Sequence, residues 1–484
     1  MQTPTSSLES AKAILGITSF RSYQEDIINQ VLMGNHSLVI MPTGMGKSIC
    51  YQIPALVLEG MTIVISPLIA LMYDQVAALR NKGIDATFIN SSLSKEERNS
   101  RYESVAVNKY KILYVTPERF RSSKFLDVLS NVRISLLAID EAHCISQWGH
   151  DFRPDYSRMR EIRGILKNPT TIALTATATK RIQDDIIFEL GLHSEQMKIY
   201  HGGIARQNLY LHVESFVEET IKWNAILNLL QSSPPGPKVI YFNLIDKLEK
   251  FSEFLISNTT KHHIYHGKLS PHERNKIQRN FLTQKDGILL ATNAFGMGID
   301  KSDIRMVIHA ELPLSIESYY QEIGRAGRDG VNAKCYLFYT ESDLAVLLDF
   351  IEWQNPDPHF IKRVYETLVF AGDSLRSIDY KDLQAKVVHK NRGDHRLQTV
   401  LNLFDRYGVT SGDIELNSLR VRGILPKELT LKETWDEKKQ NSLKRLYEML
   451  MYIKSNNCRR LFLYDYFGET FHECSHCDIC SNQI

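Results

Sequence analysis

The chain has 484 residues, 43% hydrophobic and 24% charged, which is the composition of a globular protein of about three domains. Its formal net charge of +2 excludes a globally basic nucleic-acid binder, so any contact with nucleic acid must come from local surfaces. Residues 1–5 lack the pattern of a signal peptide, and no apolar run approaches the roughly 20 residues of a membrane-spanning helix. We therefore predict a cytoplasmic protein without a membrane partner.

Short apolar runs alternate with amphipathic segments over the first part of the chain. The runs span residues 37–41, 61–65, 111–115 and 136–139. Such runs are typical of parallel strands that are buried on both faces. Each run ends at a polar or glycine-rich motif, which is where an open α/β sheet binds its ligands. We predict a first α/β lobe over residues 1–207.

A glycine-rich loop at residues 41–48 follows the first run. Met41 replaces the first glycine of the strict phosphate-loop pattern, but Gly44 and Gly46 still permit a backbone nest that cradles phosphate. Lys47 can then reach the β- and γ-phosphates, and Ser48 can ligate Mg²⁺. The alternative is a chance glycine turn at the start of a helix. We expect the loop to bind ATP through Thr43, Gly44, Gly46, Lys47 and Ser48.

An acidic motif, residues 140–143, directly follows the apolar run 136–139. Asp140 is suited to hold Mg²⁺, and Glu141 to orient and deprotonate a water molecule that attacks the γ-phosphate. The alternative is a solvated acidic helix start. Two adjacent carboxylates at the end of a buried strand favour the hydrolytic interpretation.

A second α/β lobe is predicted over residues 208–354, with strands at 238–242, 287–292 and 306–309. The proline-rich stretch 231–237 is interpreted as a surface loop within this lobe. A glycine-arginine run, residues 321–330, follows the last strand. Gln321, Arg325 and Arg328 are expected to act in hydrolysis, with the arginines meeting charge on the γ-phosphate. Surface arginines flanked by glycines are the alternative.

Mostly helical segments follow residue 355. Apolar spacing predicts helices near 361–368 and 380–388, and a third that Asp394 caps, with Arg396 and Arg406 on its outward face. Residues 413–422 alternate like a strand. We predict a winged-helix-like domain over 355–432, against the alternative of a helical spacer.

Four cysteines crowd the C-terminal segment 433–484, in which 438–453 is expected to be a helix. Four thiolates suit a tetrahedral structural Zn²⁺ ion, although C-x2-C-x2-C spacing also occurs in iron–sulfur clusters. His472 and His476 are possible substitute ligands. The expected ligands are Cys458, Cys474, Cys477 and Cys480. The remaining cysteines, which lie in apparent core segments, are read as buried inert thiols: Cys50, Cys144 and Cys335.

Together these motifs resemble the RecQ family of superfamily 2 helicases. The most specific marks span residues 20–24, 66–72, 140–143, 175–177, 294–301 and 321–330. The resemblance implies two tandem RecA-like lobes and an ATP-dependent DNA helicase that moves 3′ to 5′ in recombination and repair. Its expected partners are single-stranded and forked duplex DNA. A nucleotide-gated DNA-binding remodeller and an RNA helicase are the alternatives.

The resemblance also implies site residues. Arg21 and Gln24 would recognise adenine, and Asp300, in the run 294–301, is assigned to the nucleotide site. The loop after the acidic motif would bind single-stranded DNA, since aromatic rings stack on bases and basic side chains contact phosphate. Its expected contacts are Gln147, Trp148, His150, Phe152 and Arg153. The alternative places the aromatic side chains of this loop in the core.

The chain departs from the best-known family order, in which a winged helix and often a helicase-and-RNase-D C-terminal (HRDC) domain follow the zinc module. Only four residues follow Cys480. We therefore expect a short form without the HRDC domain, with its winged helix upstream of the cysteines.

Overall fold

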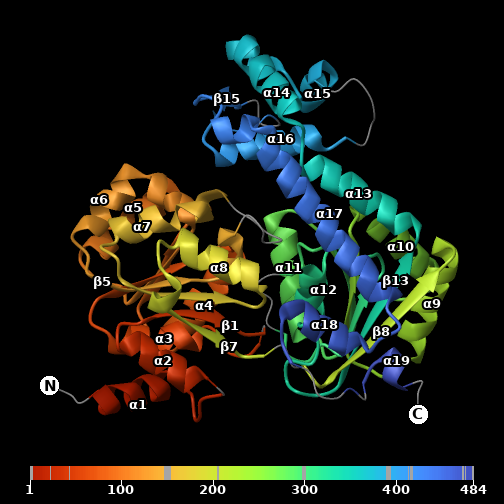
Figure 1. Ribbon diagram of the computed structural model, residues 1–484, viewed down its shortest axis with the longest axis horizontal. Helices are drawn as coiled ribbons and strands as arrows, with labels where there is room; N and C mark the ends of the chain where they lie inside the picture. Colours follow the sequence, from red (N-terminus) through yellow and green to blue (C-terminus); the bar gives the residue numbers. More distant parts are fainter. Residues whose placement is uncertain are drawn as a thin grey trace. The chain divides into compact units, whose positions relative to one another are not determined.

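The computed structural model describes most of the chain as two compact units. The described residues are 4–21, 23–42, 44–146, 154–203, 206–296, 301–387, 394–412, 414, 418–470, 474 and 476–481. One unit comprises Met1–Thr340 together with Tyr452–Ile484, and the other comprises Glu341–Met451 (Figure 1). In the described part of the chain, no helix is both long and apolar enough to cross a bilayer.

The first lobe is built on a seven-stranded parallel sheet with the strand order β3-β4-β2-β5-β6-β1-β7. Its strands are β1 (His36–Ile40), β2 (Met61–Ile65), β3 (Ala86–Ile89), β4 (Ile112–Val115), β5 (Ile134–Ile139), β6 (Thr170–Thr175) and β7 (Met197–His201). The accompanying helices are α1 (Pro4–Leu15), α2 (Gln24–Leu32), α3 (Ile49–Val57), α4 (Ile69–Asn81), α5 (Lys95–Ala106), α6 (Ser123–Ser130), α7 (Met159–Ile165) and α8 (Lys180–Glu189).

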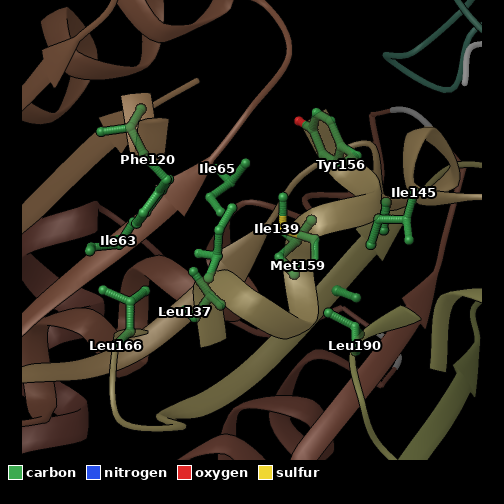
Figure 2. Close-up of a cluster of buried hydrophobic side chains, with 14 of the residues drawn as sticks. Ile63, Ile65, Phe120, Leu137, Ile139, Ile145, Tyr156, Met159, Leu166 and Leu190 are labelled. Carbon is green, nitrogen blue, oxygen red and sulfur yellow. The ribbon is translucent and has the colours of Figure 1, made fainter. Parts of the chain in front are cut away.

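Both faces of this sheet are buried, as its apolar runs require. One core cluster contains Ile63, Ile139 and Met159, and Figure 2 shows these side chains converging from β2, β5 and α7. The opposite cluster contains Val39 of β1 and Val64 of β2, together with residues of α2 and α3. The alternation of side chains along each strand thus supplies both cores.

The second lobe contains a six-stranded parallel sheet with the order β10-β11-β9-β12-β13-β8. Its strands are β8 (Leu209–Phe216), β9 (Pro237–Tyr241), β10 (His263–Tyr265), β11 (Gly287–Ala291), β12 (Met306–His309) and β13 (Ala333–Thr340). Its helices are α9 (Glu219–Ser232), α10 (Ile245–Ser257), α11 (Pro271–Thr283) and α12 (Ile316–Ile323). The proline-rich stretch connects α9 with β9.

The predicted fold class of two parallel α/β lobes followed by a mostly helical region is confirmed.

The second unit is helical apart from a short antiparallel ribbon. It contains α13 (Ser342–Gln354), α14 (Pro358–Ala371), α15 (Tyr380–Val387), α16 (Arg396–Arg406), β14 (Thr410–Ser411), β15 (Arg420–Val421) and most of α17 (Lys432–Lys454). Its core joins Val364 of α14, Leu383 of α15, Phe404 of α16 and Trp435 of α17. The three helices predicted after residue 355 are therefore present.

The second unit departs from the predicted pattern in two places. The ribbon pairs Thr410 with Val421, so its first strand precedes the segment 413–422 that was expected to form the wing. The N-cap position of α16 is His395, and Asp394 instead accepts a hydrogen bond from the Arg396 backbone N–H at 2.9 Å.

The predicted domain boundaries at 354/355 and 432/433 do not coincide with the limits of the compact units. α13 belongs to the second unit because it packs on α16, where the Trp353 and His395 rings lie 4.8 Å apart. Trp435, near the start of α17, also lies in that unit's core. The end of α17 lies in the first unit, with α18 (Arg459–Phe467) and α19 (Asp478–Ser481).

Candidate nucleotide site and metal centre

The glycine-rich loop connects the end of β1 with the start of α3. Gly44 and Gly46 have φ angles of +87° and +82°, a left-handed backbone that other residues adopt only with strain. A Cβ atom on Gly46 would also lie 2.6 Å from Nε2 of Gln24. The two glycines are therefore required by the shape of the loop. Thr43 lies outside the described residues.

Lys47 is buried within this loop, with its ammonium near the acidic motif. Its Nζ donates a hydrogen bond to the Met41 carbonyl at 3.0 Å. Burial lowers the pKa of Lys47, while Glu141 and Asp140 act in the opposite direction. A buried cation held beside two carboxylates at the carboxyl ends of β1 and β5 is suited to bind an anionic phosphate with a metal ion.

The acidic motif follows β5 directly. Burial and the neighbouring Glu141 raise the pKa of Asp140, so the ionised carboxylate is disfavoured unless a cation is bound beside it. Glu141 has a φ angle of +48°, and its N–H donates to Asp140 Oδ1 at 3.0 Å. Left-handed backbone at a residue other than glycine is a strained state that is concentrated at functional sites.

His143 connects the acidic motif with the end of β6, a link that sequence reasoning missed. Its Nδ1 lies 3.4 Å from Glu141 Oε2 and 3.0 Å from the Thr175 hydroxyl. The Thr175 hydroxyl in turn donates to the Thr177 carbonyl at 3.0 Å. Both motifs were recognised in the sequence, but their contact depends on β5 and β6 being neighbours in the sheet.

Arg21 and Gln24 lie against the glycine-rich loop. Gln24 Nε2 donates to the carbonyls of Met45 and Gly46 at 3.1 and 3.2 Å, and its Oε1 accepts from the Arg21 N–H at 2.8 Å. Arg21 Nη1 donates to the Gly44 carbonyl at 2.8 Å. Both side chains therefore support the loop, which sequence reasoning did not predict. Their recognition of adenine stays a prediction.

The glycine-arginine run leaves α12 as a turn, so its two arginines do not share a helix face. Gln321 lies in the last part of α12, which ends at Ile323. Arg325 is buried, and the Tyr241 hydroxyl lies beside it. Arg328 lies over the phosphate loop, because a Cβ atom on Gly44 would be 3.1 Å from its Cγ. Arg328 thus adds a second cation near Lys47.

Two groups of expected site residues lie outside the described part of the chain. They are Asp300 and the aromatic loop with Gln147, Trp148, His150, Phe152 and Arg153. The residues that flank this loop, Cys144 and Tyr156, are buried in the core of the first lobe.

The four C-terminal cysteines converge on one point. The sulfur atoms of Cys458, Cys474, Cys477 and Cys480 all lie within 4.8 Å of one another. Four sulfurs bound to a single Zn²⁺ ion at about 2.3 Å would lie about 3.8 Å apart, whereas an iron–sulfur cluster would hold its thiolates farther apart. The donor set therefore fits one zinc ion. His476 is not part of this group, and His472 lies outside the described residues.

Buried polar contacts attach this cysteine cluster to the second sheet. Cys477 pairs with Leu211 of β8, whose N–H donates to the His476 carbonyl at 3.3 Å. Arg459 donates to both carboxylate oxygens of Asp478, and Asp478 accepts from the Val213 N–H at 3.0 Å. The module thereby covers the edge strand of the sheet, which would otherwise expose unpaired backbone groups.

Comparison with protein families assigns three segments of the chain. The DEAD/DEAH box helicase family matches residues 21–185, and the helicase conserved C-terminal domain matches residues 221–330. The RecQ zinc-binding family matches residues 419–481, which include the four cysteines.

Curated relatives cover the chain to different extents. The ATP-dependent DNA helicase RecQ of Pasteurella multocida is 44% identical over 341 residues, 70% of this chain and 53% of the relative. The probable ATP-dependent DNA helicase RecS of Bacillus subtilis is 35% identical over 472 residues, 96% of this chain and 90% of the relative. The chain spans about half the length of the RecQ relatives from Pasteurella multocida and Bacillus subtilis.

Solved structures share the fold at low identity. Saccharomyces cerevisiae Dbp5 bound to RNA and ADP BeF3 matches with a TM-score of 0.56 and 18% identity, covering 71% of this chain and 90% of that chain. Mycobacterium smegmatis helicase Lhr bound to single-stranded DNA and AMP-PNP matches with a TM-score of 0.54 and 17% identity, covering 87% of this chain and 60% of that chain.

Proposed function

Because the chain belongs to the RecQ family of helicases, we propose that it is an ATP-dependent DNA helicase that separates the strands of duplex or forked DNA. The observation that carries this proposal is the burial of Lys47 between the phosphate loop and two carboxylates. A buried ammonium beside two carboxylates, at the end of a strand, supports a site for an anionic phosphate with a metal ion.

In this proposal the first lobe binds ATP with Mg²⁺. The loop N–H groups and Lys47 hold the β- and γ-phosphates, and Ser48 and Asp140 hold the metal ion, which neutralises phosphate charge when bound. Glu141 orients a water molecule and accepts its proton. The raised pKa of Asp140 supports a site built to receive a cation.

The second lobe contributes the remaining polar groups of the hydrolytic site. Arg325 and Arg328 stabilise the charge that develops on the γ-phosphate, and Gln321 contacts the same region. The position of Arg328 beside Gly44 supports this role. The remaining nucleotide contacts that we propose are Arg21, Gln24, Thr43 and Asp300.

DNA binding is assigned to two surfaces. The loop 147–153 binds the single strand through its aromatic and basic residues. The second unit acts as a winged-helix-like domain that binds the duplex, which helices α14, α15 and α16 and the antiparallel ribbon support. We propose movement from 3′ to 5′ and a cytoplasmic role in recombination and repair.

ATPase and strand-separation assays on matched substrates test this function. Forked DNA should be unwound in the presence of ATP and Mg²⁺, and single-stranded DNA should stimulate hydrolysis more than RNA of the same sequence. An enzyme unwinding only the RNA fork would be an RNA helicase, and DNA-stimulated hydrolysis without unwinding would identify a remodeller. Lys47→Ala should abolish hydrolysis while single-stranded DNA still binds, because its strand contacts are assigned to other loops.

A further inference from the structure

The backbone of the turn that carries Arg325 and Arg328 accepts hydrogen bonds from the guanidinium group of Arg206, a residue outside the turn. Arg206 precedes β8, and its Nη1 donates to the Gly324 carbonyl at 3.0 Å. Its Nη2 donates to the carbonyls of Ala326 and Gly327. Three carbonyls of this turn thus accept hydrogen bonds from one side chain, which lies far from them in sequence.

Asn208 adds a second contact to the same turn. Its Nδ2 donates to the Gly327 and Val331 carbonyls, both at 2.8 Å. Gly327 has a φ angle of +54°, and a Cβ atom there would lie 2.5 Å from that Nδ2. The turn and the Asn208 amide therefore fit together only because residue 327 is glycine.

These contacts determine the conformation of the turn. Residues 324–328 follow the end of α12, where carbonyls lose their helical partners, although the Gly327 carbonyl also accepts the Gly330 N–H at 3.0 Å. Leaving buried carbonyls without donors costs about 1–3 kcal/mol each, and a charged donor makes the stronger hydrogen bond. Arg206 and Asn208 therefore favour one path for the backbone that carries both arginines.

The cysteine module contacts the segment from which Arg206 and Asn208 project. Arg460, two residues after Cys458, donates through Nη2 to the Gln207 carbonyl at 2.9 Å and to the Leu209 carbonyl at 2.6 Å. These carbonyls flank Asn208. A continuous series of hydrogen bonds and backbone connections thus runs from the cysteine module to the turn that carries Arg325 and Arg328.

We propose that Arg206 and Asn208 are positioning residues that place Arg325 and Arg328 for ATP hydrolysis, and that Arg460 connects them to the cysteine module. This inference rests on the proposed function, because it assigns the arginines to the γ-phosphate. Loss of correct placement should weaken transition-state stabilisation more than ground-state binding of ATP, so kcat should fall while KM changes little.

Arg206→Lys tests this placement, because lysine keeps the charge but lacks the planar fork that reaches three carbonyls. We expect kcat of DNA-stimulated ATP hydrolysis to fall about tenfold while KM for ATP stays within about twofold. Amide hydrogen exchange of residues 324–331 in the nucleotide-free protein should also become faster.

A double-mutant cycle separates positioning from general destabilisation. If Arg206 acts through Arg325, then Arg206→Lys should change single-turnover hydrolysis less than about twofold in an Arg325→Ala background. Equal losses in both backgrounds, or faster exchange with unchanged kcat, would overturn the inference. A wild-type protein that does not hydrolyse ATP would contradict the proposed function, whereas the exchange measurement would still decide whether Arg206 holds the turn.

Two further variants and one control complete the test. Asn208→Ala and Arg460→Ala should each lower kcat selectively, with effects that are not additive with Arg206→Lys. The control is Arg163→Lys, which alters a buried arginine whose Nε donates to the Thr171 hydroxyl at 3.0 Å in the first lobe. It should leave the exchange of residues 324–331 unchanged, and faster exchange there would mean that any buried arginine has this effect.

Discussion

Glu141 combines two properties that a structural carboxylate seldom has. Its backbone adopts a φ angle of +48°, and its carboxylate lies 3.4 Å from Nδ1 of the buried His143. Asp140 accepts the backbone N–H of Glu141, which holds the Asp140 carboxylate against the backbone of Glu141. Strain of this kind costs of the order of 1–3 kcal/mol and persists only where the surrounding structure maintains it. The position favours a residue that is held for chemistry.

Glu141→Gln should separate nucleotide binding from hydrolysis. The amide keeps the size of the side chain and leaves Lys47 and Asp140 in place, so ATP affinity should change less than about threefold. Loss of the proton acceptor should lower kcat by about 10²-fold or more. Single-turnover hydrolysis and equilibrium binding of a fluorescent ATP analogue measure the two effects. Glu103→Gln, on the exposed face of α5, is the matched control and should behave as wild type.

Residues that belong to a motif with a characteristic spacing could be found from the sequence. Residues that act by hydrogen bonding to backbone atoms elsewhere in the chain could not. Lys47, Asp140 and the four cysteines stand in recognisable patterns. Arg206 has no such pattern, because its three acceptors are backbone carbonyls more than a hundred residues away. The double contact of Gln24 with the loop was hidden for the same reason.

At the scale of elements, the parallel strands were the easiest to predict and the second unit the hardest. Near-continuous apolar runs mark buried strands whatever their neighbours. Each strand of the ribbon in the second unit is only two residues long, which is too short for alternating apolar and polar residues to reveal it in the sequence. Arg396 was expected on the outward face of its helix, but it forms an ion pair with Asp394 and lies over the Phe360 ring at 4.8 Å. Its contact with Asp394 makes a structural role the simpler interpretation.

Lys438 on α17 should make the second unit sensitive to pH. Burial, with Arg406 and Arg445 nearby, lowers the pKa of Lys438 to about 8. A lysine in the unfolded chain has a pKa of about 10.4, so the unfolded state binds more protons between these values. Stability should therefore rise with pH from about 8 to about 10, because the desolvation cost of the partly buried ammonium disappears as it deprotonates.

Lys438→Met should remove this cost at all pH values. At pH 7 its melting temperature should exceed that of wild type by about 2 °C, and the difference should shrink toward pH 10. Differential scanning calorimetry at both pH values provides the measurement. Lys427→Met changes an exposed lysine of the same unit and is the control. Any change it makes in the melting temperature should be the same at pH 7 and at pH 10. A Lys438→Met difference that is the same at both pH values would contradict the assignment.

Cys477→Ser should release the zinc ion and loosen the module. A serine hydroxyl is not a thiolate ligand, and Cys477 is fully buried where its segment pairs with Leu211 of β8. Elemental analysis should find about one zinc and no iron in wild type, and much less zinc in the variant. Hydrogen exchange should become faster in β8 as its edge loses that contact. Cys144→Ser, in the core of the first lobe, should keep the zinc.

At the scale of the whole molecule, a net charge of +2 leaves DNA affinity to local groups of cations. The second unit contains one such group at the end of α16 and along α17, where Arg406 and Arg445 both lower the pKa of Lys438. Cations that repel one another in the free protein become favourable when a phosphate binds among them. This group, rather than Arg396, is therefore the better candidate for the duplex contact of the second unit.

Reversing two of these charges, Arg406→Glu with Arg445→Glu, should weaken forked-duplex binding and reduce its dependence on salt, because fewer counterions are released from the DNA. Basal ATP hydrolysis should persist, since the phosphate loop, the acidic motif and the arginine turn all lie in the other unit. Unwinding should fall further than hydrolysis stimulated by single-stranded DNA, because strand separation requires the duplex to be held while the motor moves. Arg133→Glu with Lys109→Glu makes the same change of charge near the amino ends of β4 and β5, away from the nucleotide site, and is the matched control. If both double variants unwound forks equally well, the cations of α16 and α17 would not contact the duplex, and the second unit would be a spacer.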